Sequence, residues 1–381
     1  MSPLPQHPAT HHAVFRQLLS DGPISRAELA RRCGLSKQTL TLICRALETA
    51  GLIRQTGETG GHIGRRASVF APVPEAACCA VVDLGGTKVA VALSTLAGTL
   101  LPGMTEPTDG RGGQHVITQI ARLCREAAAA AGLDWSRVRH AVIGVPGAPD
   151  LTAGRVMMAP NIPAFDTFDV RDAFAEALGC SVQLENDVNL SAEGERWALS
   201  AAAPVLDMAY VSVGTGIGCG LICDGRLLRG AAHAAGEIAF LPFGADPFDP
   251  QSRDCGALEQ EAGSHGMRRR YLALSGEDIT VPEIFARAEQ GNSAAEAVLE
   301  DTARLAARAI AALAAITNPA LVVLGGSIGA RPDFIARVSA LLPLCHPAPP
   351  EIRRSQLGGG APLTGAARLG LPRLIEAALG G

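Results

Sequence analysis

A Gly-Gly turn between two apolar segments of the sequence carries groups suited to binding an anion. Asp83 ends the first segment, and Gly85 and Gly86 allow backbone N–H groups to approach a phosphate closely. Thr87 and Lys88 then add a hydroxyl and a cation. The turn lacks the spacing of the GxxxxGK[ST] phosphate loop, and Gly-Gly is also common in plain β-hairpins. A phosphate-binding turn and a structural hairpin therefore both remain open.

Two further glycine-rich turns follow apolar strand patterns later in the chain. Gly214, Thr215 and Gly216 lie within AYVSVGTGIGCGLICDG, between two such patterns. Gly325 and Gly326 lie within ALVVLGGSIG, which follows a long Ala-rich amphipathic helix. Each turn offers backbone donors to a phosphate, so the three turns together favour two similar lobes that bind a nucleotide.

A carboxylate that can act as a base lies in the segment QLENDVNLSAEGE. Asp187 follows Asn186 directly and precedes a helical pattern. At the end of a strand, such a carboxylate can accept the proton of a substrate hydroxyl that attacks a phosphoryl group, while the Asn amide holds another hydroxyl. The alternative is that the pair caps the helix, and capping is compatible with catalysis.

The residues before these turns predict a separate helical unit. Three helical patterns follow one another closely between residues 13 and 53. In the second, Ser25 and Glu28 are spaced as a capping box, in which each side chain accepts the other residue's backbone N–H. Ser36 can cap the third helix, whose apolar stripe is formed by Leu40, Ile43 and Leu47. The order is helix, helix, turn, helix.

The outer face of the third helix is polar and suited to a DNA major groove. It carries Lys37, Gln38, Thr39, Thr41 and Arg45. A plain three-helix bundle also has a polar outer face, so that alternative stays open on periodicity alone. The next stretch, LIRQTGETGGHIGRRASVFAP, predicts two strands around a hairpin that carries Arg65 and Arg66. Because paired guanidinium groups on such a wing suit phosphate or a narrow minor groove, the segment favours a winged helix that binds DNA.

The charge of the chain divides at the same place. Residues 1 to 72 hold nine Arg or Lys and four Asp or Glu, a balance of +5, and the remainder holds 24 against 33, a balance of −9. A basic head joined to an acidic body predicts that the head meets a polyanion and the body a small or neutral ligand.

Length and composition exclude several classes of protein. A chain of 381 residues predicts two or three folding units rather than one small module. The ten scattered cysteines show neither a secreted disulfide framework nor paired zinc couplets. The sequence contains no membrane-spanning run and no signal-peptide pattern, so we expect a cytoplasmic protein with no membrane partner.

Eight motifs in order give the sequence a specific resemblance. DLGGTK, VIGVPGAPD, APNIP, ENDVN, VGTGIGCGLICDGRLLRG, AGEI, LGGS and TGAARLG occur between residue 77 and about residue 372. In this order they resemble the ROK family of repressors, open reading frames and kinases. With a winged helix in front, the chain resembles a ROK transcriptional regulator. The resemblance implies an actin-like, ribonuclease-H-like α/β fold of two lobes with a sugar between them.

The resemblance also implies roles for individual residues. The ATP phosphates would contact Asp83, Gly85, Gly86, Thr87, Lys88, Gly214, Thr215 and Gly216, and the adenosine would lie near Gly325 and Gly326. The sugar hydroxyls would be held by Asn186, Asp187, Glu237 and Glu259. In the kinases of the family, Asp187 would be the general base, with ATP and Mg²⁺ as cosubstrates.

Two departures concern the zinc site that the family usually has. Phe240 stands where the zinc-binding His is expected, and Ala257 stands where the last Cys is expected. Cys255 alone cannot complete a site that takes about four ligands, so we expect no structural zinc. A Phe in place of the His also predicts an altered or less polar ligand. The DLGGTK turn and Asp187, in contrast, are intact, which keeps kinase activity open.

These observations give three hypotheses on one domain plan. The plan is a winged helix over 1–72, a linker over 73–78, a first lobe over 79–190 completed by a helix over 361–381, and a second lobe over 191–360. The favoured hypothesis is a homodimeric or homotetrameric regulator, a repressor more than an activator, that binds a DNA operator and responds to a sugar or sugar derivative. The alternatives are an ATP-dependent sugar kinase and a DNA-binding scaffold insensitive to ligand.

Overall fold

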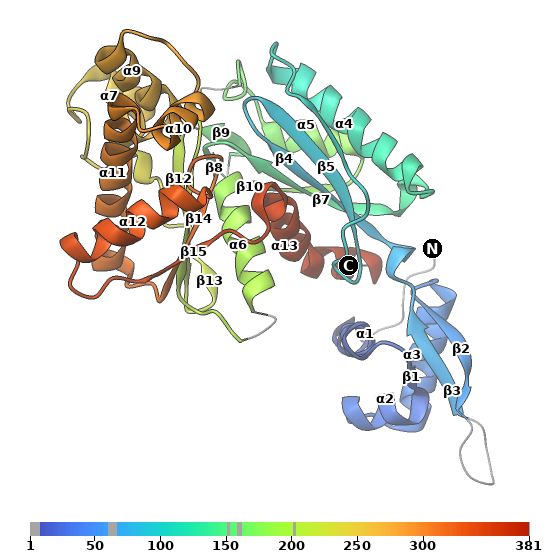
Figure 1. Cartoon of the computed structure of the whole chain (residues 1–381). Helices are drawn as coiled ribbons and strands as arrows, with labels where there is room; N and C mark the ends of the chain where they lie inside the picture. Colours follow the sequence, from blue (N-terminus) through green and yellow to red (C-terminus); the bar gives the residue numbers. More distant parts are fainter. Residues whose placement is uncertain (1–7, 60–66, 151–152, 158–161, 201–202, 381) are drawn as a thin grey trace. The chain divides into compact units, whose positions relative to one another are not determined.

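The N-terminal head is a winged helix-turn-helix. The computed structural model describes residues 8–59, 67–150, 153–157, 162–200 and 203–380. The head contains α1 (Pro8–Asp21), β1 (Ile24–Ser25), α2 (Arg26–Cys33), α3 (Lys37–Thr49), β2 (Ile53–Thr59) and β3 (Ala67–Pro72). Its strands form one sheet in the order β1-β3-β2, and β2 and β3 pair as the antiparallel strands of the wing (Figure 1). Arg65 and Arg66 lie outside the described residues.

Apolar residues at helical spacing hold the three helices of the head together. The fully buried side chains include Val14, Phe15, Leu18, Leu29, Leu40 and Leu47. The predicted turn between α2 and α3 is confirmed, because Gly34 adopts a left-handed conformation with φ 64°. The predicted cap of α3 is confirmed too, since Thr39 N donates to Ser36 Oγ at 3.1 Å.

Of the two hydrogen bonds in the predicted capping box of α2, the one to the Ser25 side chain is confirmed, and the one to the Glu28 side chain was wrong. Glu28 N donates to Ser25 Oγ at 3.3 Å, as expected. The Glu28 carboxylate, however, accepts from Arg31 Nε at 2.8 Å and from Arg32 Nε at 3.0 Å instead of turning back to Ser25. Charge-assisted bonds to two guanidinium groups are stronger than one bond from a neutral backbone donor. These partners lower the pKa of Glu28 to about 2.

The described residues form two compact units. The first covers Met1–Pro146, Leu151–Glu185 and Ala366–Gly381, and the second covers Gly147–Asp150 and Asn186–Gly365. No helix in the described part of the chain has the length and hydropathy needed to cross a membrane. The domain boundaries given above from the sequence stay predictions.

The α/β lobe of the first unit is built on a five-stranded sheet. Its strands lie in the order β10-β7-β4-β5-β6, with β4 antiparallel to β5 and parallel to β7. Buried residues of the sheet pack with those of α4 and α5, which lie along it in Figure 1. The elements are η1 (Pro74–Ala76), β4 (Cys78–Leu84), β5 (Lys88–Thr95), β6 (Met104–Pro107), α4 (Gly113–Ala130), η2 (Trp135–Arg137), β7 (Val138–Val145), β9 (Arg155–Met157), α5 (Val170–Leu178) and β10 (Ser181–Asn186).

The second unit repeats this arrangement. Its sheet has the order β13-β12-β11-β14-β15, again with a hairpin, β11 with β12, beside a parallel strand, β14. The elements are β8 (Ala148–Asp150), α6 (Asp187–Leu199), β11 (Met208–Val213), β12 (Ile217–Cys223), β13 (Arg226–Leu227), η3 (Ile238–Phe240), α7 (Pro250–Cys255), α8 (Ala257–Ala262), α9 (Ser264–Ser275), α10 (Val281–Glu289), α11 (Ser293–Thr317), β14 (Leu321–Gly325), α12 (Pro332–Cys345), β15 (Glu351–Arg354) and η4 (Gly358–Gly360); α13 (Ala361–Ala378) continues into the first unit. The prediction of two similar α/β lobes is confirmed.

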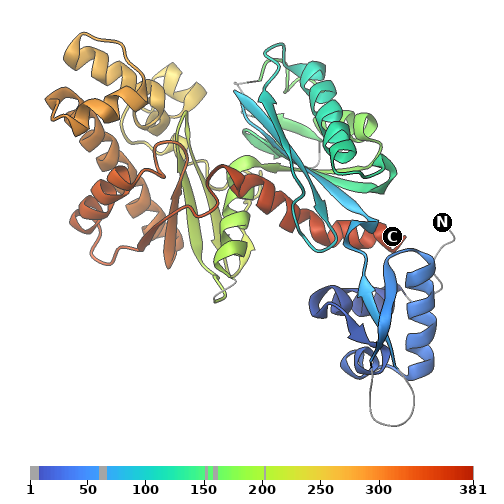
Figure 2. The ribbon, with the colours of Figure 1, turned by 45° about the vertical axis from the view of Figure 1, so that its right-hand side comes forward.

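Both faces of the second sheet are covered because alternate side chains of a strand point to opposite sides. Ala209, Val211 and Val213 pack into the core formed with α8 to α12. Met208 and Tyr210 pack on the other side with Ala192 of α6. Figure 1 and Figure 2 show α6 on one side of this sheet and the α10–α12 group on the other.

Within the second unit, the first residues of α13 contact α6 closely. A Cβ on Gly365 would overlap the carbonyl oxygen of Leu190, and a Cβ on Gly194 would overlap that of Ala361. Beside this contact, the buried carboxylate of Glu195 accepts from Gln356 N at 3.1 Å and from Leu357 N at 3.0 Å. Glycine is therefore required on both helices at this contact.

Candidate functional site

The outer face of α3 presents the residues predicted to contact DNA. Lys37, Gln38, Thr39, Thr41 and Arg45 are all exposed, while Leu40, Ile43 and Leu47 are buried. Two hydroxyls of this face are already engaged within the protein. Thr41 Oγ1 donates to the Lys37 carbonyl oxygen at 2.7 Å, and Thr39 Oγ1 lies 2.8 Å from Ser36 Oγ. Within the described residues, Lys37, Gln38 and Arg45 make no side-chain hydrogen bond or ion pair.

The first glycine-rich turn is a tight hairpin between β4 and β5. Gly85 N donates to the Lys88 carbonyl oxygen at 2.9 Å, and Gly86, Thr87 and Lys88 are exposed. Asp83 lies at the end of β4, where burial raises its pKa to about 6 although the charge of Lys88 opposes this. The turn thus exposes Lys88 close to a carboxyl whose pKa is raised by burial.

The second and third turns lie against each other in the second unit. Ile328 N and Gly329 N both donate to the Val213 carbonyl oxygen at 2.9 Å, which ties the segment after β14 to the end of β11. Gly326 has φ 80°, and a Cβ on it would overlap the Val213 carbonyl oxygen. Gly325 is buried, where a Cβ would overlap the hydroxyl of Tyr210. The close approach predicted from these glycines is therefore made by protein atoms here.

Glu259 supports the second turn. Ile217 N donates to Glu259 Oε2 at 2.9 Å, and a Cβ on Gly216 would overlap the same oxygen. Burial raises the pKa of Glu259, and the hydrogen bond from Ile217 N acts in the opposite direction. One oxygen of this predicted sugar ligand is therefore occupied by the backbone.

Asn186 and Asp187 form the start of α6, as both interpretations of the sequence required. Asn186 Oδ1 accepts from Val188 N and Asn189 N, each at 2.9 Å, and Asn186 Nδ2 donates to the Gly147 carbonyl oxygen at 3.0 Å. Asp187 is half-buried, and its Oδ1 accepts from Val188 N at 2.9 Å. Capping is thus confirmed, while a role of Asp187 in binding or catalysis stays a prediction.

Strand β12 brings the predicted sugar ligands of the second unit into one region. Gly218 contacts Val188 beside Asp187, and Cys219 N donates to the Gly236 carbonyl oxygen at 3.1 Å, next to Glu237. Burial raises the pKa of Glu237, and the charge of Glu259 adds to that rise. The element η3, which begins directly after Glu237, contacts α8, which carries Glu259.

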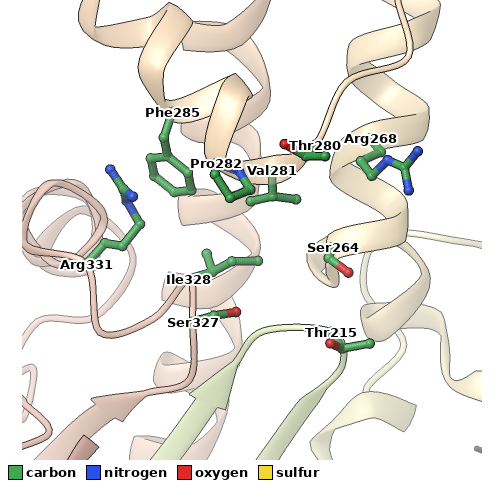
Figure 3. A pocket seen from close by; sticks show the side chains of 10 residues that line it. All are labelled: Thr215, Ser264, Arg268, Thr280, Val281, Pro282, Phe285, Ser327, Ile328 and Arg331. Atoms are coloured by element: carbon green, nitrogen blue, oxygen red, sulfur yellow. The ribbon is translucent and has the colours of Figure 1, made fainter. Parts of the chain in front are cut away.

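A pocket of about 260 Å³ lies beside the second and third turns. Figure 3 shows side chains from the two turns, α9 and α10 around it. Its polar lining includes the hydroxyls of Thr215, Ser264 and Ser327 and the guanidinium of Arg268. Arg331 and Phe285 also line the pocket. The Arg331 Cζ atom lies 3.8 Å from the centroid of the Phe285 ring, which is a cation–π contact.

Of these lining residues, only Thr215 was predicted from the sequence to bind a ligand. Ser264, Arg268 and Phe285 lie in ordinary amphipathic helix patterns, which carry no local sign of a pocket. The position of Arg331 was a weak indication that it lies near a binding site, because it stands between the third glycine turn and Pro332, which begins α12.

The positions of the expected zinc ligands are used for other contacts. Ala257 is buried at the start of α8, Phe240 is 41% exposed, and Cys255 Sγ donates to the Gln251 carbonyl oxygen at 3.3 Å. Among the described residues, no group of three or more His, Cys, Asp or Glu side chains is placed to hold a metal ion. The expected absence of structural zinc stays a prediction.

Comparison with known families agrees with both parts of the chain. A model described as winged helix-turn-helix DNA-binding matches residues 9–54. The model of the ROK family matches residues 79–372, which is most of the chain. The chain belongs to the ROK family.

Relatives of this ROK protein include both kinases and repressors. It is 29% identical over 303 residues to N-acetyl-D-glucosamine kinase of Shigella flexneri serotype 5b, covering 76% of this chain and 98% of the kinase. It is 25% identical over 326 residues to the xylose repressor of Caldicellulosiruptor bescii, covering 82% of this chain and 81% of the repressor. A solved ROK family transcriptional regulator, a homologue of the E. coli MLC protein, shares its fold with TM-score 0.72 at 24% identity, over 98% of this chain and 97% of that one.

Proposed function

We propose that this ROK protein is a DNA-binding transcriptional regulator, a repressor of sugar metabolism genes that responds to a sugar or sugar derivative. The observation that carries the proposal is a winged helix-turn-helix joined to a ROK body in one chain. The match to the kinase relative covers 98% of the kinase but only 76% of this chain. The match to the solved regulator covers 98% of this chain. A DNA-binding head has no part in phosphoryl transfer, so the head favours regulation.

We propose that the effector binds in the body near β12. Supporting this, Glu237 and Glu259 lie at η3 and α8, which contact each other, and Val188, beside Asp187, contacts strand β12. Carboxylates accept hydrogen bonds from sugar hydroxyls, and an amide such as that of Asn186 can both donate to them and accept from them. Phe240, 41% exposed and three residues after Glu237, would offer an apolar surface to the ligand.

Coupling to DNA requires only that the effector prefers one state of the protein. A difference of about 1 to 3 kcal/mol between the two states changes DNA affinity about 5- to 150-fold. In a homodimer or homotetramer, two heads would bind half-sites spaced by about 34 to 36 Å or a multiple of it. A small change in the separation of the heads would then be enough to release the operator.

The test is DNA binding by the full chain with and without sugars. We expect the chain to bind DNA from upstream of its own coding sequence in an electrophoretic shift, and one of xylose, N-acetylglucosamine or related sugars to weaken that binding at least fivefold. Asp187→Ala should retain DNA binding and lose the response, whereas Arg45→Ala should lose DNA affinity and retain sugar binding in a thermal-shift measurement. Absence of DNA binding at low salt would overturn the proposal.

A second candidate function is ATP-dependent phosphorylation of a sugar, with Asp187 as the general base. Supporting it, Asp187 is half-buried at the start of α6, and Lys88 is exposed at the first turn. The pocket beside the second and third turns also fits part of a nucleotide, because its hydroxyls and Arg268 can bind ribose or phosphate oxygens. ATP, bound with Mg²⁺, would supply the transferable phosphoryl group. Asp187 would accept the proton of the attacking sugar hydroxyl.

An ADP-release assay with a panel of hexoses, amino sugars and pentoses tests the kinase candidate. If the candidate is right, one sugar will stimulate ADP release, and Asp187→Asn will abolish it while leaving sugar binding measurable. No release with any sugar, or release unaffected by Asp187→Asn, would exclude this mechanism.

A further inference from the structure

An exposed leucine lies at the centre of the outer face of α3. The helix buries Leu40, Ile43, Cys44 and Leu47. At 100° per residue, the line opposite this buried stripe runs through Gln38, Leu42, Arg45 and Thr49. Leu42 is 68% exposed, although every other residue on that line is polar. Leu42 is not among the residues predicted from the sequence to contact DNA.

Single exposed leucines are common on protein surfaces and need no explanation by themselves. Leu42 differs because of its neighbours and its position. Gln38 lies one turn before it, and Arg45 lies about one turn after it, so an amide and a cation flank the apolar side chain on one face. It also lies in the N-terminal half of α3, the part of a recognition helix that contacts base edges.

The other groups of the face leave the central position to Leu42. The hydroxyls of Thr39 and Thr41 are bonded to Ser36 Oγ and to the Lys37 carbonyl oxygen. Lys37 and Arg45 are cations, which contact phosphates or the acceptor atoms of guanine. Leu42 is the apolar side chain at the centre of this face, so it is the group there that suits an apolar part of a base.

We infer that Leu42 reads thymine, by packing its side chain against the thymine C5-methyl group in the major groove of the operator. The inference rests on the proposed DNA-binding function. The thymine methyl is the one apolar group that base pairs present in that groove. Gln38, one turn away, suits the donor and acceptor of adenine, so the two side chains together select an A·T-containing half-site.

Replacement of thymine by deoxyuridine tests this inference, because it removes the C5-methyl and leaves base pairing unchanged. Duplexes that bind the full chain are first selected from a random DNA library. Each thymine of a selected half-site is then replaced singly, and affinity is measured by fluorescence anisotropy. For wild type we expect one position per half-site at which affinity falls about fourfold, the effect of losing one buried methyl group.

Two variants complete the test. Leu42→Ala should bind the thymine duplex more weakly than wild type and should bind the thymine and uracil duplexes equally well. Leu344→Ala, which truncates an 81% exposed leucine of α12 in the second unit, should keep the full sensitivity to uracil. Both side chains are exposed, so both variants should melt at the wild-type temperature.

The outcomes separate the two proposals. If no duplex is selected, the DNA-binding function fails, and the inference fails with it. If duplexes are selected but wild type is insensitive to uracil at every position, or if Leu42→Ala is as sensitive as wild type, the role of Leu42 is overturned while DNA binding stands.

Discussion

The charge state of Asp83 depends on its position at the end of β4 in the first lobe. Burial at the end of β4 raises its pKa to about 6, well above the ordinary value for an aspartic acid, and Lys88 only partly offsets this. Because the folded pKa is the higher one, the folded state binds the proton more tightly than the unfolded chain does. The stability that this group contributes is therefore present below about pH 4 and is lost as the pH rises through about 6.

Asp83→Asn should remove this pH dependence. We expect the variant to be more stable than wild type at neutral pH by on the order of 1 to 3 kcal/mol, with the difference closing towards pH 4. Urea unfolding of both proteins across that pH range is the measurement. A difference that is constant with pH would contradict the account of the buried carboxyl.

Some roles of single residues could be predicted from the sequence, and others could not. The cap at Ser36 follows from a rule that involves residues three apart, and it was predicted. The bond from Ile217 N to Glu259 joins residues 42 positions apart, and no local pattern indicates it. The hydrogen bonds from Arg31 and Arg32 to Glu28 were not predicted, because the pairing of charges three and four residues apart competes with the capping box for the same carboxylate.

At the scale of elements, the contact between α6 and α13 depends on two glycines. Gly365→Ala would place a methyl group on the Leu190 carbonyl oxygen, which is backbone and cannot move away cheaply. We expect a loss of stability of about 2 kcal/mol or more, as for overpacked cores. Calorimetric or urea unfolding would measure it.

The matched control for that prediction is Gly359→Ala. Gly359 has open space around it and lies in the neighbouring η4 turn. Its substitution should change stability by less than about 0.5 kcal/mol. Equal effects of the two substitutions would show that the contact between α6 and α13 does not require glycine.

Strands and turns were the elements that the sequence predicted best. Each glycine-rich turn follows a short apolar run, and at Gly326 the close approach of the Val213 backbone requires glycine. The pocket could not be predicted, because Arg268 and Phe285 come from separate helices and reach it only through packing. Periodicity identifies the buried face of a helix but not the element that covers it.

For the whole molecule, the division of charge predicts a strong salt dependence of DNA affinity. The head holds nine basic and four acidic residues, and Lys37 and Arg45 on α3 are exposed. Log affinity falls as log salt rises, and each phosphate contact that is lost should make this negative slope less steep by about 1. The double variant Lys37→Ala, Arg45→Ala should therefore have a slope less steep by about 2 if both residues contact phosphate.

Arg304→Ala is the control for this measurement. Its side chain is 56% exposed on α11, so the variant removes one exposed cation that belongs to the second unit and not to the head. We expect its salt slope to equal that of wild type. A double variant of α3 with an unchanged slope would contradict the assignment of the head to DNA.

The two exposed lysines have a practical consequence for labelling. Lys37 at the start of α3 and Lys88 in the β4–β5 turn are the only lysines in the sequence, and the other 31 of its 33 Lys and Arg residues are arginine. A reagent that reacts with ε-amino groups will therefore modify the proposed DNA-binding helix and the proposed phosphate turn, and no other lysine. Coupling the protein to a surface through its lysine ε-amino groups would block both of these proposed sites. A fluorophore attached in the same way would report on both, and bound DNA should protect Lys37 from the dye.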